Sequence, residues 1–316
     1  MTQVQNNSKG ILYILVGMIL FSIQDALIKF VYEEVALYEL YFGRTFTALI
    51  LLISYLKFSK QKIILKTYYP LLTFVRVICF FFGFSFFHIS LTFMSLAEAN
   101  ALFFSSPFFV SILATIFLKE KVGIRRWSAI VVGFIGVFIV LNPNFSDFNY
   151  MKLAPVACAL CYAMSMTITK ITSDKDNVYT QMIHLYIGAI TISFLFFIFT
   201  GKGQFNTFSD PTFQFMFREW GTNLPFSLPF IVSMGIVSTF SFYFVFNAYS
   251  IASPSVVSIY EYSLIIWSIL TGYILFNSIP TSRILIGVVT IIGAGIYIYI
   301  REKTKDQLIA TDTPNR

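Results

Sequence analysis

Long apolar runs alternate with short breaks of charged and turn-forming residues along the 316-residue chain. The hydrocarbon core of a bilayer is about 30 Å thick, so a helix that crosses it needs roughly 20 mostly apolar residues. The runs have about this length, and the breaks before Leu96 and Pro254 are the shortest. We therefore predict an all-α membrane protein with about ten transmembrane helices, at residues 11–30, 38–56, 70–92, 96–118, 127–142, 153–170, 180–200, 227–250, 254–277 and 282–300.

The segments outside these runs are short and leave no room for a soluble catalytic domain. Residues 1–10 form a short N-terminal segment, and the polar residues 301–316 are predicted to be a disordered tail. Lys9 precedes the first run as in a signal peptide, but the absence of a small-residue cleavage site favours a first membrane span. The longest connection, residues 201–226, is predicted to lie on the membrane surface as a short amphipathic piece.

Basic residues gather in alternate breaks, on the side that carries the N-terminus. They are dense in residues 57–66, 119–126 and 301–316. The breaks on the opposite side hold only Lys152, Lys202, Arg218 and Arg283. Cytoplasmic loops of membrane proteins carry the excess of Lys and Arg, so both termini are predicted to be cytoplasmic. This requires an even number of spans.

Composition separates the chain from soluble proteins. It is 57% hydrophobic and only 12% charged, with a mean hydropathy of +0.77, whereas a soluble domain is about a quarter charged. The net charge of +7 would suit a nucleic-acid partner if the basic residues lay on one continuous face. Because it lies in short clusters between apolar runs, the predicted partners are the lipid bilayer and a small-molecule solute, with no nucleic acid.

The cysteines and histidines give no pattern typical of a cofactor or metal site. Cys158 and Cys161 form a CxxC inside an apolar run, where packing of small side chains is the favoured interpretation. The two histidines, His88 and His184, lie in separate spans without clustered acids. No metal and no cofactor are predicted.

The two halves of the chain resemble each other weakly. A shift of 157 residues superposes Glu120 on Asn277, Arg126 on Arg283 and Gly136 on Gly293. Each half, residues 11–142 and 153–300, would contain five spans. Because five is odd, the second copy would enter the membrane upside down, which is a common architecture of secondary transporters.

Specific stretches resemble a known family. They are Phe93 to Pro107, Phe117 to Lys121 and Gly133 to Gly136, and they resemble the drug/metabolite transporter superfamily of EamA type. With Gln24 to Lys29, Arg44 and Arg76, the chain is similar to the branch that contains S-adenosylmethionine uptake transporters and other metabolite permeases of bacterial inner membranes. The resemblance implies two inverted five-helix EamA repeats around a central cavity with alternating access. Asn277 stands where the second repeat would carry glutamate.

Charged residues inside the spans are candidates for function, because a charge at the bilayer centre costs about 2.5–3.5 kcal/mol on insertion scales. Asp25 and Lys29 are four residues apart, so they share one helix face and could pair, either as an ion pair that orients the helix or in a functional role. Arg44 lies deep in its span and is expected to bind a substrate carboxylate or to pair with Asp25. The candidates for binding substrate or a coupling ion are Asp25, Arg44, Arg76, His184, Tyr260, Glu261 and Tyr262.

Glu261 is the candidate for coupling. It lies about two turns into its span between Tyr260 and Tyr262, so it must be protonated, paired or solvated. Arg76 is at similar depth and is its expected partner. His184 could serve proton coupling, and His88 and Glu98 are expected near the outer edge of the membrane.

These features predict a secondary active transporter of a small organic metabolite and not an enzyme. The alternative is a membrane-embedded enzyme acting on a lipid or isoprenoid, but no DxxxD-type acid cluster, HxxxxD-type motif or Walker A loop is present. A scaffold or channel would not need an inverted repeat with buried charges. The sequence leaves open whether the transporter imports or exports its substrate. It also leaves open whether transport is coupled to a proton or another ion or is an exchange, and whether the chain forms a homodimer.

Overall fold

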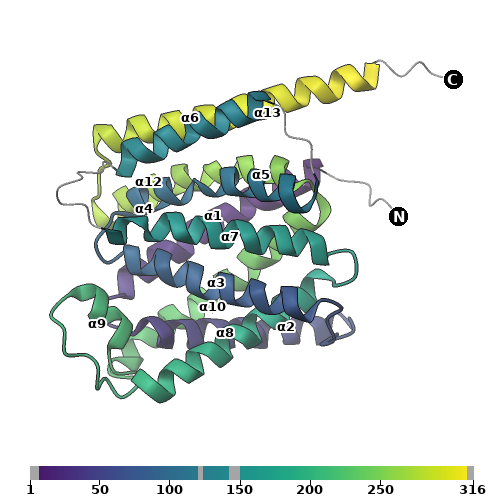
Figure 1. The fold of residues 1–316 in the computed structure, drawn as a ribbon. Coiled ribbons are helices and arrows are strands. Elements are labelled where there is room, and N and C mark those ends of the chain that lie inside the picture. The colour runs from purple at the N-terminus through teal and green to yellow at the C-terminus, as the bar shows by residue number, and fades with distance from the viewer. Residues whose placement is uncertain (1–6, 120–123, 142–149, 312–316) are drawn as a thin grey trace.

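The computed structural model describes residues 7–119, 124–141 and 150–311, and these residues form helices without any strand. Figure 1 shows the long helices side by side in a bundle, with both termini at the same end. Glu120 of the predicted repeat lies outside the described residues. The helices of the first half are α1 (Asn7–Val31), α2 (Leu37–Phe58), α3 (Pro70–Ser90), α4 (Leu96–Phe103), α5 (Ser106–Phe117) and α6 (Ile124–Leu141). Those of the second half are η1 (Tyr150–Leu153), α7 (Ala154–Thr172), α8 (Val178–Thr200), α9 (Pro211–Phe217), α10 (Leu224–Ile251), α11 (Pro254–Val257), η2 (Ser258–Tyr262), α12 (Ser263–Phe276) and α13 (Ser282–Thr311).

Within the described ranges, seven helices are long and apolar enough to cross a membrane, and three apolar helices are shorter. The seven are Asn7–Val31, Leu37–Phe58, Pro70–Ser90, Leu96–Phe117, Tyr150–Thr172, Val178–Thr200 and Leu224–Ile251. The shorter ones, Val131–Val140, Tyr260–Phe276 and Ser282–Ala294, fall in the other three predicted runs. The all-α membrane fold is thus confirmed, while the number of ten crossings stays a prediction.

The fourth span of each half is interrupted. In the first half, Phe104 and Ser105 separate α4 from α5, where Pro107 near the start of α5 cannot continue the hydrogen bonding of the preceding helix. In the second half, the 3-10 turn η2 separates α11 from α12. The two interruptions meet, because the rings of Phe104 and Tyr262 lie 5.5 Å apart. Broken helices at the interface of inverted repeats are typical of transporter binding sites.

Helix contacts repeat between the halves. α1 packs along α10 as α7 packs along α3, α2 packs against α8, and α6 packs against α13. α1 and α7 run in opposite directions (Figure 1). Each helix contact thus recurs with the two halves exchanged, which is the pattern expected of two inverted copies related by one axis.

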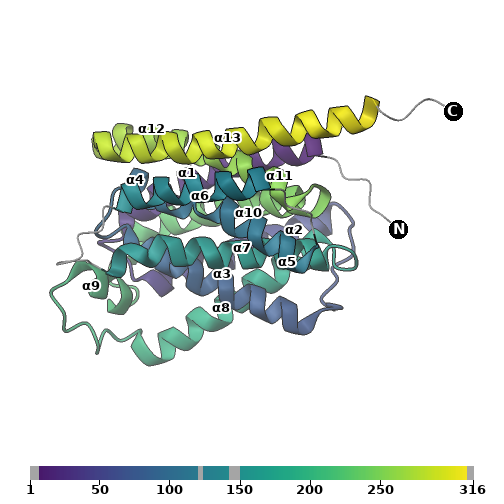
Figure 2. The ribbon, with the colours of Figure 1, turned by 45° about the horizontal axis from the view of Figure 1, so that its top comes forward.

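α6 and α13 form a separate layer on one side of the bundle (Figures 1 and 2). They approach closely at two glycines. A Cβ on Gly136 would meet the carbonyl oxygen of Gly287 at 3.0 Å, and a Cβ on Gly287 would meet that of Gly136 at 2.9 Å. Small residues allow helices to pack in this way in lipid.

The tail differs from the prediction of disorder. α13 continues to Thr311, so the tail is helical as far as the structure describes it. Residues 301–311 contain good helix formers and neither Gly nor Pro, which explains the continuation of the helix beyond the apolar run.

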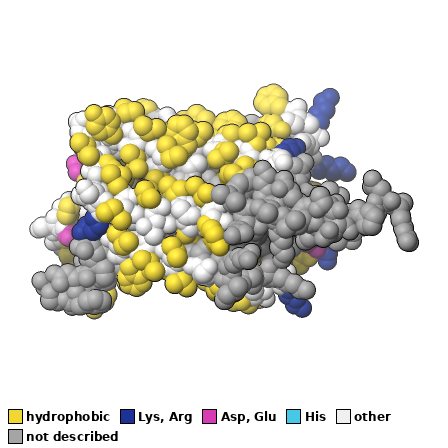
Figure 3. All heavy atoms as spheres, turned by 90° about the horizontal axis from the view of Figure 1, so that it is seen from above, with side chains coloured by type: hydrophobic (Ala, Val, Ile, Leu, Met, Phe, Trp, Pro, Cys, Tyr) yellow, Lys and Arg dark blue, Asp and Glu magenta, His cyan; other side chains and the backbone are white. Residues whose placement is uncertain are grey.

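The outer face is apolar. Figure 3 shows hydrophobic side chains over the visible flank, with charged side chains at its two ends and most of the basic ones at the end that carries the termini. The long connection contains α9, which packs against α2 and α3.

Candidate functional site

Among the described residues, the first of two small central pockets lies between α1, α3, α4, α7 and α12, and its free volume is about 20 Å³, which is room for about one water molecule. Its polar lining consists of Asp25, Asn100 and Tyr162, and its other walls are aromatic or aliphatic. The lining residues are Met18, Phe21, Asp25, Phe84, Phe87, Asn100, Phe103, Tyr162 and Leu264. Asp25 is only 4% exposed. This pocket therefore offers a buried acid and an amide to a ligand.

The second pocket lies between α2, α3, α8 and α10 and also has a free volume of about 20 Å³. It contains Arg44, which is 3% exposed. Its lining is Tyr41, Arg44, Thr45, Phe80, Phe81, Phe84, Leu185, Tyr186, Ala189 and Phe242. Because Phe84 lines both pockets, they are neighbours of opposite polarity.

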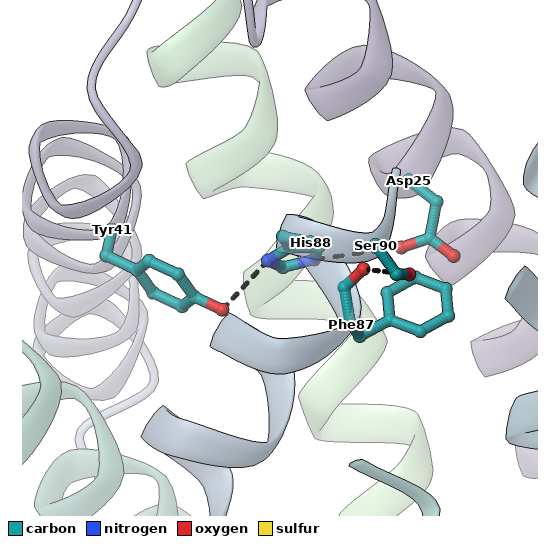
Figure 4. A network of polar contacts seen from close by, with 5 residues as sticks. All are labelled: Asp25, Tyr41, Phe87, His88 and Ser90. Atoms are coloured by element: carbon teal, nitrogen blue, oxygen red, sulfur yellow. Dashed lines mark hydrogen bonds and ion pairs between the residues drawn. The ribbon is translucent and has the colours of Figure 1, made fainter. Parts of the chain in front are cut away.

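His88 of α3 connects the two pockets (Figure 4). Its Nδ1 lies 2.8 Å from the Tyr41 hydroxyl, and its Nε2 lies 4.0 Å from an Asp25 carboxylate oxygen. The Arg44 guanidinium lies over the Tyr41 ring, 4.6 Å from its centroid. His88 is fully buried in this central position, whereas its place in the span had predicted one near the outer edge of the membrane.

Asp25 and Arg44 attract each other electrostatically, but no hydrogen-bonded ion pair joins them in the part of the chain that the structure describes. The expected pair of Asp25 and Lys29 is wrong. The Lys29 ammonium instead donates to the carbonyl oxygens of Leu91 and Met94, at 2.9 and 2.7 Å. These carbonyls end α3 and need donors, which the helix itself does not supply.

Lys170 makes the matching contact in the second half. Its ammonium donates to the carbonyls of Ser250 and Ala252, at 3.1 and 3.0 Å. Each lysine ends the first helix of its repeat and binds the turn between the third and fourth spans. The two contacts lie at opposite ends of the bundle because the repeats are inverted.

The expected pair of Glu261 and Arg76 is also wrong. The Glu261 carboxylate accepts hydrogen bonds from the hydroxyls of Tyr162 and Tyr249, at 2.6 and 2.5 Å. Ser106 donates a third, longer one at 3.4 Å. Glu261 therefore lies in the interruption of one broken helix and touches the start of the other, and Tyr162 links it to the first pocket.

Arg76 is bound elsewhere, where α7 ends and α8 begins. Its guanidinium donates to the Gln181 side-chain oxygen at 2.5 Å and to the Thr172 hydroxyl at 3.4 Å. Its position along the span predicted the same depth in the membrane as Glu261. However, Arg76 lies on the face of α3 that points toward Gln181. We therefore regard Arg76 as part of the scaffold.

The other candidates lie around the pockets. The Tyr262 ring packs against Phe104 and Phe108, and Tyr260 packs against the core. His184 has one ring nitrogen 2.8 Å from the Thr180 carbonyl and the other 2.9 Å from the Leu65 carbonyl, so it holds the connection before α3. Among the described residues, these three are not in the lining of either central pocket.

The family comparison decides the class of protein. The model of the EamA-like transporter family matches residues 8–142 and again residues 151–300. This chain belongs to the EamA-like transporter family. Its two matches make it a two-repeat transporter, and nothing supports the alternative of an enzyme.

Curated relatives of the chain are transporters. It is 27% identical to the S-adenosylmethionine uptake transporter of Rickettsia prowazekii, over 93% of each chain. It is 26% identical to the riboflavin transporter of Vibrio cholerae, over 66% of this chain and 64% of that one. A solved crystal structure shares the fold, with a TM-score of 0.68 and 15% identity over 95% of this chain and 99% of the other. The chain is thus similar to transporters of small metabolites.

Proposed function

We propose that the chain moves a small organic metabolite across a bacterial inner membrane by alternating access and binds it in the two central pockets. The observation that carries this proposal is the pair of adjacent pockets that contain the buried Asp25 and Arg44. Charges buried at membrane depth are costly and serve function by default. Both pockets take their walls from helices of both repeats, where inverted-repeat transporters bind substrate.

Binding requires motion in this proposal. Aromatic rings close the pockets, with Phe84 6.0 Å from Phe21 and 5.6 Å from Phe80 between ring centroids. A metabolite therefore enters only when helices of the two repeats separate. The contacts of Lys29 and Lys170 at opposite ends supply two equivalent closures, one of which would open in each state.

S-adenosylmethionine uptake is the activity to test first, because relatives of that name match nearly the whole chain. In the proposed orientation both termini face the cytoplasm. The charge pattern of the loops and the position of both termini at one end support this. Glu261 is the proposed coupling residue, since it lies between the two interrupted helices.

Thermal unfolding of the detergent-purified protein with a panel of metabolites tests the proposal. The panel contains S-adenosylmethionine, riboflavin, nucleosides, amino acids and quaternary amines, with lipids as controls. A ligand that binds the folded state raises the unfolding temperature in a concentration-dependent manner. Uptake of the same solute into proteoliposomes then establishes transport. A shift with lipids or isoprenoid precursors alone would contradict the proposal.

A further inference from the structure

Arg44 has hydrogen-bond donors without acceptors, although it is buried. Its Nε and Nη1 atoms make no hydrogen bond. The other deeply buried arginine, Arg76, finds acceptors in Gln181 and Thr172 for its Nη1 atom, and among its nitrogens only Nε is left without a partner. Buried polar groups are nearly always bonded, so the free donors of Arg44 need an explanation. Because Arg44 lines the second pocket, its Nε and Nη1 atoms are available to a ligand that binds there.

Tyr186 supplies another donor to the same pocket. It is fully buried, and its hydroxyl makes no hydrogen bond. Thr239 lies beside it, but no hydrogen bond joins the two hydroxyls, and that of Thr239 donates to the carbonyl of Gly235 at 2.8 Å. The guanidinium fork and a phenolic hydroxyl together match the two oxygens of a carboxylate.

The first pocket has the opposite chemistry. Asn100 is 1% exposed, and its amide oxygen makes no hydrogen bond. It lies beside the Asp25 carboxylate. An acid next to an amide with a free oxygen suits an ammonium or another cationic group that donates hydrogen bonds.

We propose that the two pockets bind opposite ends of one zwitterionic, amino-acid-type metabolite. Its carboxylate binds Arg44 and Tyr186, its cationic end binds Asp25 and Asn100, and its apolar part lies against Phe84. This proposal rests on the proposed transport function and assigns its substrate class. An acid or an amine alone would leave Asp25 or Arg44 buried without a counter-charge, which is costly. One arginine without a lysine in the lining also disfavours a phosphate dianion.

Matched pairs of probes test the carboxylate subsite. The amino-acid probes are S-adenosylmethionine, methionine and tryptophan, and each is compared with its decarboxylated amine. Binding to the purified full-length protein is measured by isothermal titration and thermal shift. The native protein should bind at least one amino acid about 10- to 100-fold more tightly than its amine, as expected for a hydrogen-bonded charge pair.

The variants separate the two subsites. Arg44→Gln should weaken binding of the amino acid about 10- to 100-fold and leave its amine within about twofold, so that discrimination disappears. Tyr186→Phe should reduce discrimination less. Asp25→Asn should weaken both probes of a pair, because both keep the cation. The unfolding temperature of each variant without ligand serves as the control for folding.

Two results would overturn the inference. They are unchanged discrimination between the two probes of a pair in Arg44→Gln, and binding of only carboxylate-free solutes by the native protein. Each leaves transport itself intact. Failure of the proposed function is distinct, since then no solute of the wider panel binds or enters proteoliposomes.

Discussion

Replacing Gln181 by Leu should destabilise the fold strongly, because Gln181 supplies the main acceptor for a buried charge. The Arg76 guanidinium is fully buried and donates to the Gln181 side-chain oxygen at 2.5 Å. After the replacement its remaining acceptors are the Thr172 hydroxyl and the Gln181 carbonyl, at 3.4 and 3.5 Å. A buried donor left without its acceptor costs about 1–3 kcal/mol when it is neutral and more when it is charged, so the loss should be about 3 kcal/mol or more. We expect a loss of this size in the free energy of unfolding.

Arg76→Met should cost less, because it removes the charge together with its donors. It leaves the Gln181 oxygen without a donor, which costs about 1–3 kcal/mol. The double variant Arg76→Met with Gln181→Leu lacks both the buried charge and the unpaired oxygen. Its loss should therefore be smaller than that of Gln181→Leu alone, with a coupling energy of about 2 kcal/mol or more.

Unfolding titrations in mixed micelles, with melting temperatures as a second measure, provide the assay. Gln24→Leu is the matched control, since Gln24 is equally buried but neither of its amide atoms makes a hydrogen bond. That control should be neutral within about 0.5 kcal/mol or stabilising. Additive losses in the double variant, or a control as damaging as Gln181→Leu, would refute the reasoning.

Three further sets of variants test the coupling residue, the matched lysines and the glycine contact. Glu261→Gln keeps an oxygen for Tyr162 and Tyr249 but removes the carboxylate, so it should express normally and transport at least tenfold more slowly in proteoliposomes; normal transport would exclude a coupling role. Lys170→Met should increase hydrogen exchange at residues 250–257, and Lys29→Met should increase it at residues 91–96, each with little effect at the opposite end of the bundle. An equal increase at both ends in either variant would contradict the proposal that the two lysines close the two ends separately. Gly287→Val should lower the melting temperature because its side chain meets the Gly136 carbonyl, whereas Gly293→Ala points into open space and should not; equal effects would show that the α6–α13 contact is not close.

Periodicity and charge predicted much of the fold. Each predicted apolar run contains a helix, because crossing a bilayer imposes a length and an apolar composition that are visible along the chain. The interruption near Pro107 had a local signal, but η2 had none that we recognised. The helical continuation after Arg301 was missed because polarity was interpreted as disorder, although helix formers fill the segment.

Side-chain partners were much harder to predict, since depth in the membrane does not give direction around a helix. Arg44 and Asp25 were found because burial of a charge is visible in the sequence, and both line pockets. Glu261 was paired with Arg76 from depth alone, whereas its hydroxyl partners come from α7 and α10. Two of the other donors in the pockets, Asn100 and Tyr186, carry no net charge and gave no comparable signal.

The two halves match in scaffold but not in chemistry. Val31 and Thr172, which end α1 and α7, lie 141 residues apart, as do Lys29 and Lys170. The shift of 157 that aligns the later helices is larger by 16, because the second half carries the long connection with α9 between its second and third spans. The shift of 157 that aligns the later helices therefore does not align Lys29 with Lys170.

The same shift of 141 shows that the pocket charges have no counterpart in the other half. It places Asp25 on Met166 and Arg44 on Leu185, both apolar. The scaffold thus repeats between the halves, while the acid and the arginine come from one repeat only. A symmetric site would accept a ligand in two orientations. In the proposed binding mode, an acid at one end and a base at the other would hold a zwitterion in a single orientation, with its carboxylate toward α2 and its cationic end toward α1.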